Sequence, residues 1–418
     1  MTLRLSVLLI SFLILLVYYP SFWHVTRSDQ EVYFAVTEHK QGLWDLTAGC
    51  YHLNRREFFA AGDERLFRPL LFMFLGLEKF MFGTAPMGWQ IVGVLLHTAV
   101  AGCLLRLLWR LAAGWGAVLA ASLFALLFVN MEMVIWPHVN GYMIFALLTL
   151  IALEQGYAYV VQGFHERWRL WVIVGVLGPA CFIYETANIF IVFMFIFLIQ
   201  QQGQAKILRW LWVIPLAYGA ISLLDFIRTY HAFPSMASGQ ALSLMGIVMD
   251  TAKVLGFWLF GGLFPMNLQM FFAVRNMLAP MTLPLLSLQT WWAVSPVIVL
   301  GGGYAYALSQ SSKRLGTQGA FLLLLAMMMT AYAAIIAVGR GSQHALDDIL
   351  HQNTHYFYVF WALAVVFLYG LIDISAMRQR WIKIVMALMA IGLIAINGTK
   401  LYQINDFQAK AMNASYAH

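Results

Sequence analysis

Charged side chains are scarce in this sequence. Only 10% of the 418 residues are Asp, Glu, Lys or Arg, and 62% are hydrophobic, whereas about a quarter of the residues in soluble domains are charged. No soluble core needs that much apolar surface, so the composition excludes an ordinary water-soluble protein. The net charge of +7 does not indicate nucleic-acid binding, because Lys and Arg form small clusters between apolar runs, as in the cytoplasmic loops of membrane proteins.

Cysteine is also rare. The three cysteines, Cys50, Cys103 and Cys181, are too scattered to predict a disulfide framework or a zinc site. The sequence shows no internal repeat, no low-complexity linker and no stretch typical of a separate soluble domain. We therefore expect a single transmembrane domain over residues 1–418.

Long apolar runs are what the chain has instead. Runs near 20 residues recur along the whole sequence, and a helix of that length crosses the roughly 30 Å hydrocarbon core of a bilayer. They predict an all-α polytopic membrane protein with about eleven transmembrane helices. The runs cover approximately residues 4–23, 86–105, 111–130, 142–161, 170–184, 187–200, 210–225, 290–309, 319–338, 356–374 and 383–398.

Basic residues orient these runs. If the N-terminus is cytoplasmic and the C-terminus outside, every inside loop is basic, as the positive-inside rule requires. Most carboxylates then lie outside; Glu166 falls in an inside loop, and Glu154 and Asp373 stand near inner helix ends. The inside loops contain Arg106 and Arg110, Arg167 and Arg169, Lys206 and Arg209, Lys313 and Arg314, then Arg378, Arg380 and Lys383.

Residues 170–200 are too many for one span. A single helix of that length would be roughly 45 Å long at 1.5 Å per residue, and it would put Arg167 and Lys206 on opposite faces of the membrane. Two short helices hinged near Pro179 and Glu185 preserve the basic inside loops. This arrangement places Glu185 at or below the outer membrane surface.

Two outer segments, 24–85 and 226–289, are too long to be simple connections. The first opens with Asp29 and Glu31 directly after the first helix. Carboxylates fixed at the mouth of a cavity can act as a general base toward an acceptor hydroxyl, so both are candidate catalytic residues. The alternative is an ordinary solvated loop.

Further candidate binding residues share the outer side: Arg68, His138, Glu185, Arg340, His355 and Tyr356. A carboxylate without partners costs about 2.5–3.5 kcal/mol or more at membrane depth, so Glu185 should face a polar cavity or a basic residue, unless it only caps a helix. Guanidinium groups at Arg68 and Arg340 suit a phosphate at the membrane surface. Anchoring to lipid headgroups is the alternative.

The late outer histidines do not favour a metal site, although one at Asp347/His351 or His351/His355 is the alternative. His344, His351 and His355 are spaced seven and four residues apart, a loose spacing with no second ligand motif beside it. We expect no metal ligands among the site residues.

Taken in order, these features resemble the GT-C glycosyltransferases, polytopic enzymes that take a sugar from a polyprenyl-phosphate carrier. Aminoarabinose transferases and protein O-mannosyltransferases belong to this group. Members place an acidic residue just after the first helix, which resembles Asp29 with Glu31. Later family elements resemble segments spread over most of the chain, to about residue 360: Arg68-Pro69-Leu70, Phe82-Gly83, His97, Tyr184-Glu185-Thr186 and His355-Tyr356.

The chain departs from the family pattern at three positions. Gln30 splits the acidic pair, Tyr184 stands where the family often has Lys, and His355 stands where it often has Arg. The charge for a carrier phosphate would then come from Arg68, Arg340 or a histidine.

The resemblance implies an inverting glycosyltransferase that moves a monosaccharide from a polyprenyl-phosphate carrier to a cell-envelope glycan or lipid-linked acceptor. Asp29 would be the general base, and Glu185 and His138 would shape the acceptor or sugar pocket. No cofactor is implied. The active site would face the periplasm from a bacterial inner membrane, with membrane lipids around the helices.

Other function classes stay open. A transporter or flippase also carries polar residues in its spans, but transporters commonly show inverted repeats, whereas here the polar residues concentrate on one face. A ligase or polymerase of lipid-linked oligosaccharides would use the same side and similar Arg and His residues without an acidic pair after the first helix. A non-catalytic scaffold gives no reason for the outer acids and cations.

Overall fold

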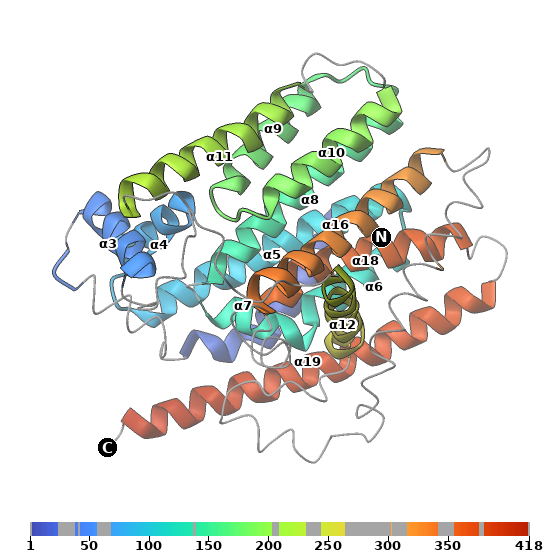
Figure 1. Ribbon diagram of the computed structural model, residues 1–418. Coiled ribbons are helices and arrows are strands. Elements are labelled where there is room, and N and C mark those ends of the chain that lie inside the picture. Colours follow the sequence, from blue (N-terminus) through green and yellow to red (C-terminus); the bar gives the residue numbers. More distant parts are fainter. Residues whose placement is uncertain are drawn as a thin grey trace.

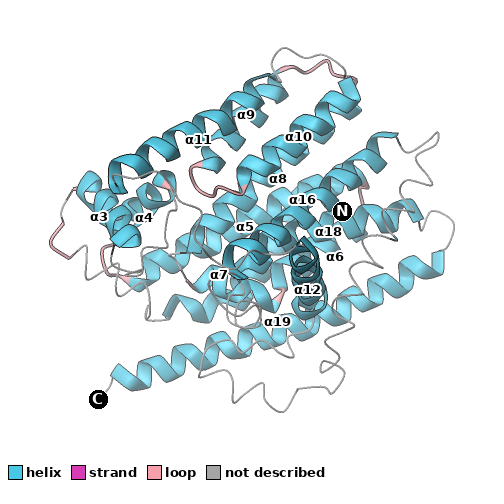
Figure 2. Ribbon diagram, in the orientation of Figure 1, coloured by secondary structure: helices cyan, strands magenta, loops and turns pink. Residues whose placement is uncertain are grey.

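A computed structural model describes most of the chain. The described residues are 2–23, 38–40, 42–56, 68–136, 139–202, 209–230, 244–263, 302, 316–341, 355–375 and 380–416. Within these ranges the chain forms helices joined by turns, with no β-strand (Figure 2). The predicted all-α class is confirmed for this part of the chain.

The helices follow the apolar runs of the sequence closely. The run at 290–309 lies outside the described residues except for position 302. Helices also form within the two long segments expected outside, at α3, α4 and α12. The bounds are α1 Leu3–Tyr18, η1 Tyr19–Trp23, α3 Leu43–Arg56, α4 Pro69–Phe82, α5 Pro86–Leu111, α6 Trp115–Leu126, η2 Phe128–Asn130, α7 Met131–Ile135, α8 Asn140–Val161, α9 Trp168–Cys181, α10 Ala187–Gln202, α11 Arg209–Tyr230, α12 Leu244–Leu263, α16 Gly316–Gly341, α18 His355–Ser375 and α19 Arg380–Tyr416.

The helices are built for a membrane. Among the described residues, five helices are long and apolar enough to cross one, in α1 with η1, α5, α8, α16 and α19, and the bent pair α6–α7 makes a sixth if it counts as one span. Large apolar side chains such as Leu8, Phe12, Leu216 and Leu388 are exposed, far beyond what water tolerates in a monomer. The protein is therefore a membrane protein that is helical throughout its described secondary structure; the count of about eleven spans stays a prediction.

Helices α5, α8 and α18 occupy the middle of the bundle (Figure 1). Helix α5 packs against α1, α6 and α8, and α18 packs against α5, α6, α8 and α16. Helices α3 and α4 pair with each other at one end, and the long α19 runs along one side (Figure 1). Most of the apolar surface of α19 is not covered by protein, as expected for a lipid-facing helix.

The predicted break within residues 170–200 is confirmed. Helix α9 ends at Cys181 and α10 begins at Ala187. Pro179 still lies inside α9, so the turn begins after Cys181 and not at the proline itself. Glu185 stands in this turn.

The expected span at 111–130 is bent. Helix α6 and the η2–α7 segment meet at an angle of 51°. A bend inside the bundle frees backbone polar groups, which hydrocarbon cannot satisfy. Side chains satisfy several of them: Asn130 Nδ2 donates to the Phe124 carbonyl at 2.6 Å, Asn397 Oδ1 accepts from the Phe128 amide at 3.1 Å, and Gln90 Nε2 donates to the Ile135 carbonyl at 3.0 Å.

One face of α5 receives this bent segment. Gly93 brings the two backbones together, because a Cβ atom at that position would lie 2.3 Å from the Val134 carbonyl oxygen. One turn further, buried His97 has Nε2 at 2.9 Å from the Ala125 carbonyl oxygen and Nδ1 at 2.7 Å from the Tyr358 hydroxyl. Since a carbonyl only accepts, Nε2 carries the proton and Nδ1 accepts from Tyr358. His97 therefore joins α5, α6 and α18.

Candidate functional site

Arg68 and Glu185 are brought together by the ends of three helices. Arg68 directly precedes α4, whose first residue is Pro69. The Leu70 amide donates to the Phe182 carbonyl at 3.1 Å, which ties the start of α4 to the turn between α9 and α10. Two positions 117 residues apart thus meet at one place.

The two side chains form a bidentate ion pair. Arg68 Nε donates to Glu185 Oε2 at 2.9 Å, and Arg68 Nη2 donates to Glu185 Oε1 at 2.8 Å. The Arg68 side chain is only 9% exposed, whereas that of Glu185 is 34% exposed. The carboxylate therefore covers the guanidinium group on its open side, in the planar geometry that also suits phosphate.

Tyrosine rings surround the guanidinium group. Its central carbon lies 4.0 Å from the centre of the Tyr184 ring, a cation–π contact. The Tyr184 ring stacks on Tyr142 at 4.1 Å between centres, and Tyr142 meets Tyr356 edge to face at 5.7 Å. We call Arg68, Glu185, Tyr142, Tyr184 and Tyr356 the Arg68 cluster; α8, α18 and the α9–α10 turn supply its tyrosines.

A buried carboxylate lies beside this region. Glu78 of α4 accepts at Oε1 from Asn140 Nδ2 at 2.9 Å, two residues before Tyr142. Helix α4 belongs to the segment expected outside the spans. Burial raises the pKa of the Glu78 carboxyl well above its usual range, and the hydrogen bond from Asn140 opposes part of that rise. The contact fixes α4 on the first turn of α8.

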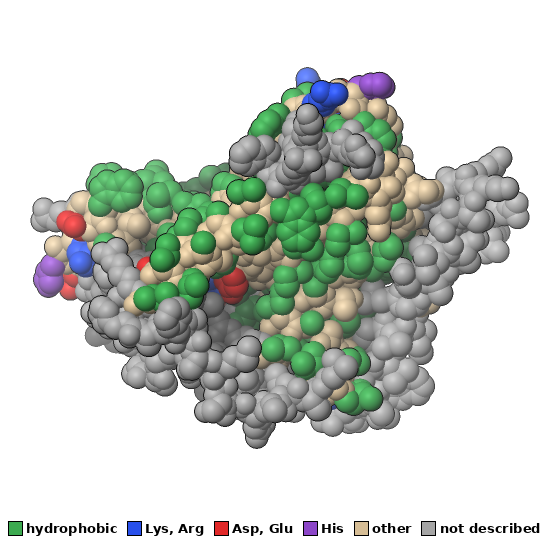
Figure 3. Space-filling model, turned by 45° about the horizontal axis from the view of Figure 1, so that its top comes forward, with side chains coloured by type: hydrophobic (Ala, Val, Ile, Leu, Met, Phe, Trp, Pro, Cys, Tyr) green, Lys and Arg blue, Asp and Glu red, His purple; other side chains and the backbone are tan. Residues whose placement is uncertain are grey.

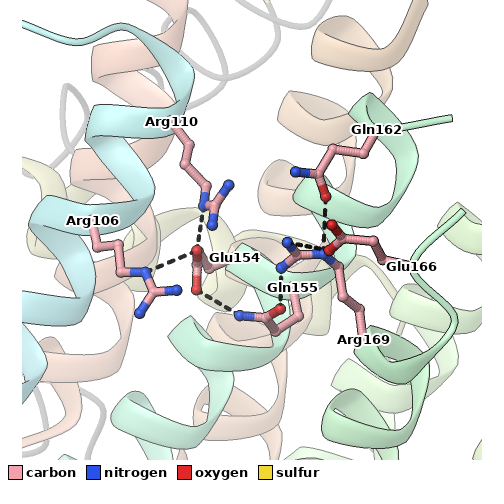
Figure 4. Close-up of polar contacts among 7 residues, drawn as sticks. All are labelled: Arg106, Arg110, Glu154, Gln155, Gln162, Glu166 and Arg169. Carbon is pink, nitrogen blue, oxygen red and sulfur yellow. Dashed lines mark hydrogen bonds and ion pairs between the residues drawn. The ribbon is translucent and has the colours of Figure 1, made fainter. Parts of the chain in front are cut away.

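A second polar cluster stands at the other end of α8. Glu154 lies twelve positions after Tyr142 on that helix, or about 18 Å further along at 1.5 Å per residue. There it meets Arg106 and Arg110 from the last turns of α5 (Figure 4). In the space-filling view, acidic side-chain atoms lie in a hollow of a largely hydrophobic face (Figure 3). Lys, Arg and His side chains gather at the top of the same view, away from that hollow.

Three of the predicted site residues converge. Arg68, Glu185 and Tyr356 belong to the Arg68 cluster, and the expectation that Glu185 faces a basic residue is confirmed. Arg340 and His355 lie on α16 and α18, whose backbones the structure describes at these positions without their side chains. Asp29, Glu31 and His138 lie outside the described residues.

Tyr142 and Glu78 were not predicted as site residues. Tyr142 belongs to the first turn of α8, next to Asn140, and polar residues at the start of an apolar helix were the available signal. Glu78 is the one carboxylate of α4, whose residues are mostly apolar apart from the neighbouring Lys79, and a carboxylate in such a helix is itself a sign of function or pairing. Within the described residues, no group of three His, Cys, Asp or Glu side chains is placed to hold a metal ion.

The sequence was compared with protein families and with curated proteins. No family model and no curated protein matches it. The function is therefore inferred from the Arg68 cluster and from the order of residues along the chain.

Proposed function

We propose that the protein is an inverting GT-C glycosyltransferase, which moves a monosaccharide from a polyprenyl-phosphate carrier to a glycan or lipid-linked acceptor. One observation carries the proposal. Three segments that resemble family elements, at Arg68, Tyr184-Glu185 and Tyr356, supply side chains to one cluster although they are far apart in the sequence. A shared binding site gives a reason for these distant segments to meet.

The reaction is a direct displacement at the anomeric carbon. The acceptor hydroxyl gives its proton to Asp29, with Glu31 as the neighbouring carboxylate, and its oxygen bonds to the anomeric carbon. The bond from that carbon to the carrier-phosphate oxygen breaks, so the anomeric configuration inverts. Phosphate is already a good leaving group, so the protein contributes chiefly alignment and charge stabilisation.

Arg68 is the proposed partner of the carrier phosphate. Its guanidinium group lies over the Tyr184 ring and pairs with the more exposed Glu185, so an arriving phosphate meets the same edge that the carboxylate covers. Glu185 then turns toward the sugar or the acceptor. Arg340 and His355 add positive charge for the phosphate, His138 shapes the pocket, and the carrier tail lies between helices.

The proposed topology has about eleven spans, a cytoplasmic N-terminus and an outer C-terminus. It is supported by the separation of the two polar clusters, since basic residues of two expected inside loops meet at one end of α8 and the Arg68 cluster occupies the other. A bacterial inner membrane with the site facing the periplasm fits this orientation.

Cysteine labelling tests the topology. With Cys50, Cys103 and Cys181 replaced, a cysteine introduced at position 29 should react with an impermeant maleimide in intact cells. A cysteine at position 165, in the turn between α8 and α9, should react only after permeabilisation. The reverse pattern would overturn the orientation.

Two alternative functions would give different results in a transfer assay. A ligase or polymerase of lipid-linked oligosaccharides would transfer whole oligosaccharides and would not depend on Asp29. A transporter or flippase would move its substrate without forming a new glycosidic bond. The expected placement of the candidate catalytic and phosphate-binding residues on one side of the membrane favours an enzyme over a translocation path.

The deciding assay supplies membranes with polyprenyl-phosphate monosaccharides and a lipid-linked glycan acceptor. Native protein should transfer sugar, and Asp29→Asn should lose at least about a hundredfold, the usual contribution of a general base. Asp45→Asn is the matched control, because Asp45 is an exposed carboxylate on α3 in the same outer segment. Transfer that survives Asp29→Asn unchanged contradicts the assignment.

A further inference from the structure

The polar cluster at the end of α8 remote from the Arg68 cluster has no role in the proposed reaction. Arg106 and Arg110 are four residues apart on α5 and therefore share a face. Both reach Glu154 of α8, while Gln155 links that carboxylate to Arg169 of α9 (Figure 4). Three helices are joined by one continuous network.

Glu154 is fully engaged. Its Oε1 accepts from Arg106 Nε at 3.0 Å and from Arg110 Nε, and its Oε2 accepts from Gln155 Nε2 at 2.8 Å. The side chain is 6% exposed. A single buried carboxylate thus faces two guanidinium groups and leaves one positive charge uncompensated at this point.

Arg169 is engaged on several sides as well. Its Nε donates to Gln162 Oε1 at 3.0 Å, its Nη1 donates to Gln155 Oε1, and its Nη2 lies 2.6 Å from Glu166 Oε2. Its side chain is buried. Arg169 therefore fixes Gln155, which in turn fixes Glu154, and this network forms a rigid base under the other two arginines.

Arg106 and Arg110 have donors to spare. Among the described residues, both give hydrogen bonds through Nε alone, so their Nη groups are free of protein acceptors. Their side chains are 53% and 31% exposed. Two guanidinium groups held together by one carboxylate through their Nε atoms present a paired set of remaining donors to an anion.

The residues around this cluster are typical of the headgroup region of a membrane. Helices α5 and α8 both qualify as membrane spans, and the arginines fall in the last turns of α5. Exposed tryptophans accompany this end of the bundle at Trp115, Trp168 and Trp171, and tryptophan is enriched at the membrane–water interface. An anion reaching Arg106 and Arg110 from the bilayer is therefore at headgroup depth.

We propose that Arg106 and Arg110 bind the phosphate of an anionic phospholipid. The uncompensated charge favours a headgroup without its own cation, so phosphatidylglycerol should bind better than phosphatidylcholine. The bound phosphate completes the charge balance of the network and clamps α5 to α8. This site is separate from the Arg68 cluster and does not rest on the glycosyltransferase proposal.

Native mass spectrometry of the full-length protein in detergent tests this site. An equimolar mixture of phosphatidylglycerol and phosphatidylcholine is added, and retained lipids are counted. Native protein should retain phosphatidylglycerol preferentially, and Arg106→Gln/Arg110→Gln should lower that preference about tenfold, or 1.4 kcal/mol. Lys253→Gln/Lys410→Gln removes the same charge from exposed positions on α12 and α19 and should leave it unchanged.

The single variant Arg106→Gln keeps the test decisive if the double variant fails to fold. Arg106→Gln leaves Arg110 paired with Glu154, so the fold should persist, and the preference should still fall by severalfold. An unchanged preference in Arg106→Gln and in the double variant overturns the proposal. So does release of the lipid by millimolar inorganic phosphate, because that outcome would assign the site to a soluble anion.

Discussion

Arg68 and Glu185 form a bidentate ion pair. The guanidinium group is buried against Tyr184, and the carboxylate is partly exposed. The pair links the residue before α4 to the turn between α9 and α10. It is thus a structural tie and, in the proposed function, the point at which a phosphate enters. These two roles make different predictions.

The structural role predicts strong coupling between the two side chains. Arg68→Gln and Glu185→Gln each remove one member of the ion pair, at a cost of about 1–3 kcal/mol, whereas the double variant should cost less than their sum. Thermal unfolding in detergent should give a coupling energy of about 0.5–3 kcal/mol. The exposed pair Asp250 and Lys253 is the control and should show almost none. Additive effects at Arg68 and Glu185 would contradict the tie.

Gly93 should not tolerate a methyl group. In Gly93→Ala the Cβ atom meets the Val134 carbonyl oxygen at 2.3 Å, so α5 and α7 must separate. We expect a loss of about 1–3 kcal/mol, as for other overpacked sites. Gly102→Ala on the same helix has open space around its Cβ position and should stabilise α5 by up to about 1 kcal/mol. Equal melting temperatures for the two variants would refute the close approach.

His97 should be required for stability. His97→Ala leaves the Ala125 carbonyl and the Tyr358 hydroxyl without their partner, and each unsatisfied buried group costs about 1–3 kcal/mol. The melting temperature should drop by several degrees. His165→Ala, at an exposed turn position, should change it little. A tolerated His97→Ala would show that the other contacts of the bent segment, including those of Asn130, Asn397 and Gln90, suffice to hold it.

Glu78 should make stability depend on pH. Because burial raises the pKa of its carboxyl in the folded state, the unfolded chain releases this proton first as pH rises. Stability should therefore fall from about pH 4.3, the unperturbed value for Glu, up to the raised value. Glu78→Gln should flatten this slope in unfolding measurements between pH 5 and 8. Exposed Glu38→Gln is the control, and equal slopes for native protein and Glu78→Gln would contradict the assignment.

Hydrophobic length and charge predicted the helices well. The positions of α1, α5, α8 and α10 follow from apolar runs, and the need of Glu185 for a basic partner follows from the cost of burying a carboxylate. Arg68 was not identifiable as that partner, because nothing local links residues 117 positions apart. The three-dimensional packing of α4 against the α9–α10 turn decides it.

The bend of α6–α7 had no signal in the sequence. Neither proline nor glycine stands near Leu127, so the run at 111–130 reads as one straight span. The compensating groups, His97, Gln90 and Asn397, come from other helices. The inner arginines were predicted as loop residues that orient the topology, but Arg106 and Arg110 lie within α5, where Glu154 can reach both.

The most direct test of the proposed function is the dependence of sugar transfer on donor concentration in Arg68→Lys. Lysine keeps the charge but loses the planar fork that would bind phosphate in a bidentate manner. With folding checked by thermal unfolding, the KM for the polyprenyl-phosphate sugar should rise about tenfold, while the KM for the acceptor stays near its native value. An unchanged donor KM in the folded variant, or a native protein that transfers no monosaccharide, would contradict the account.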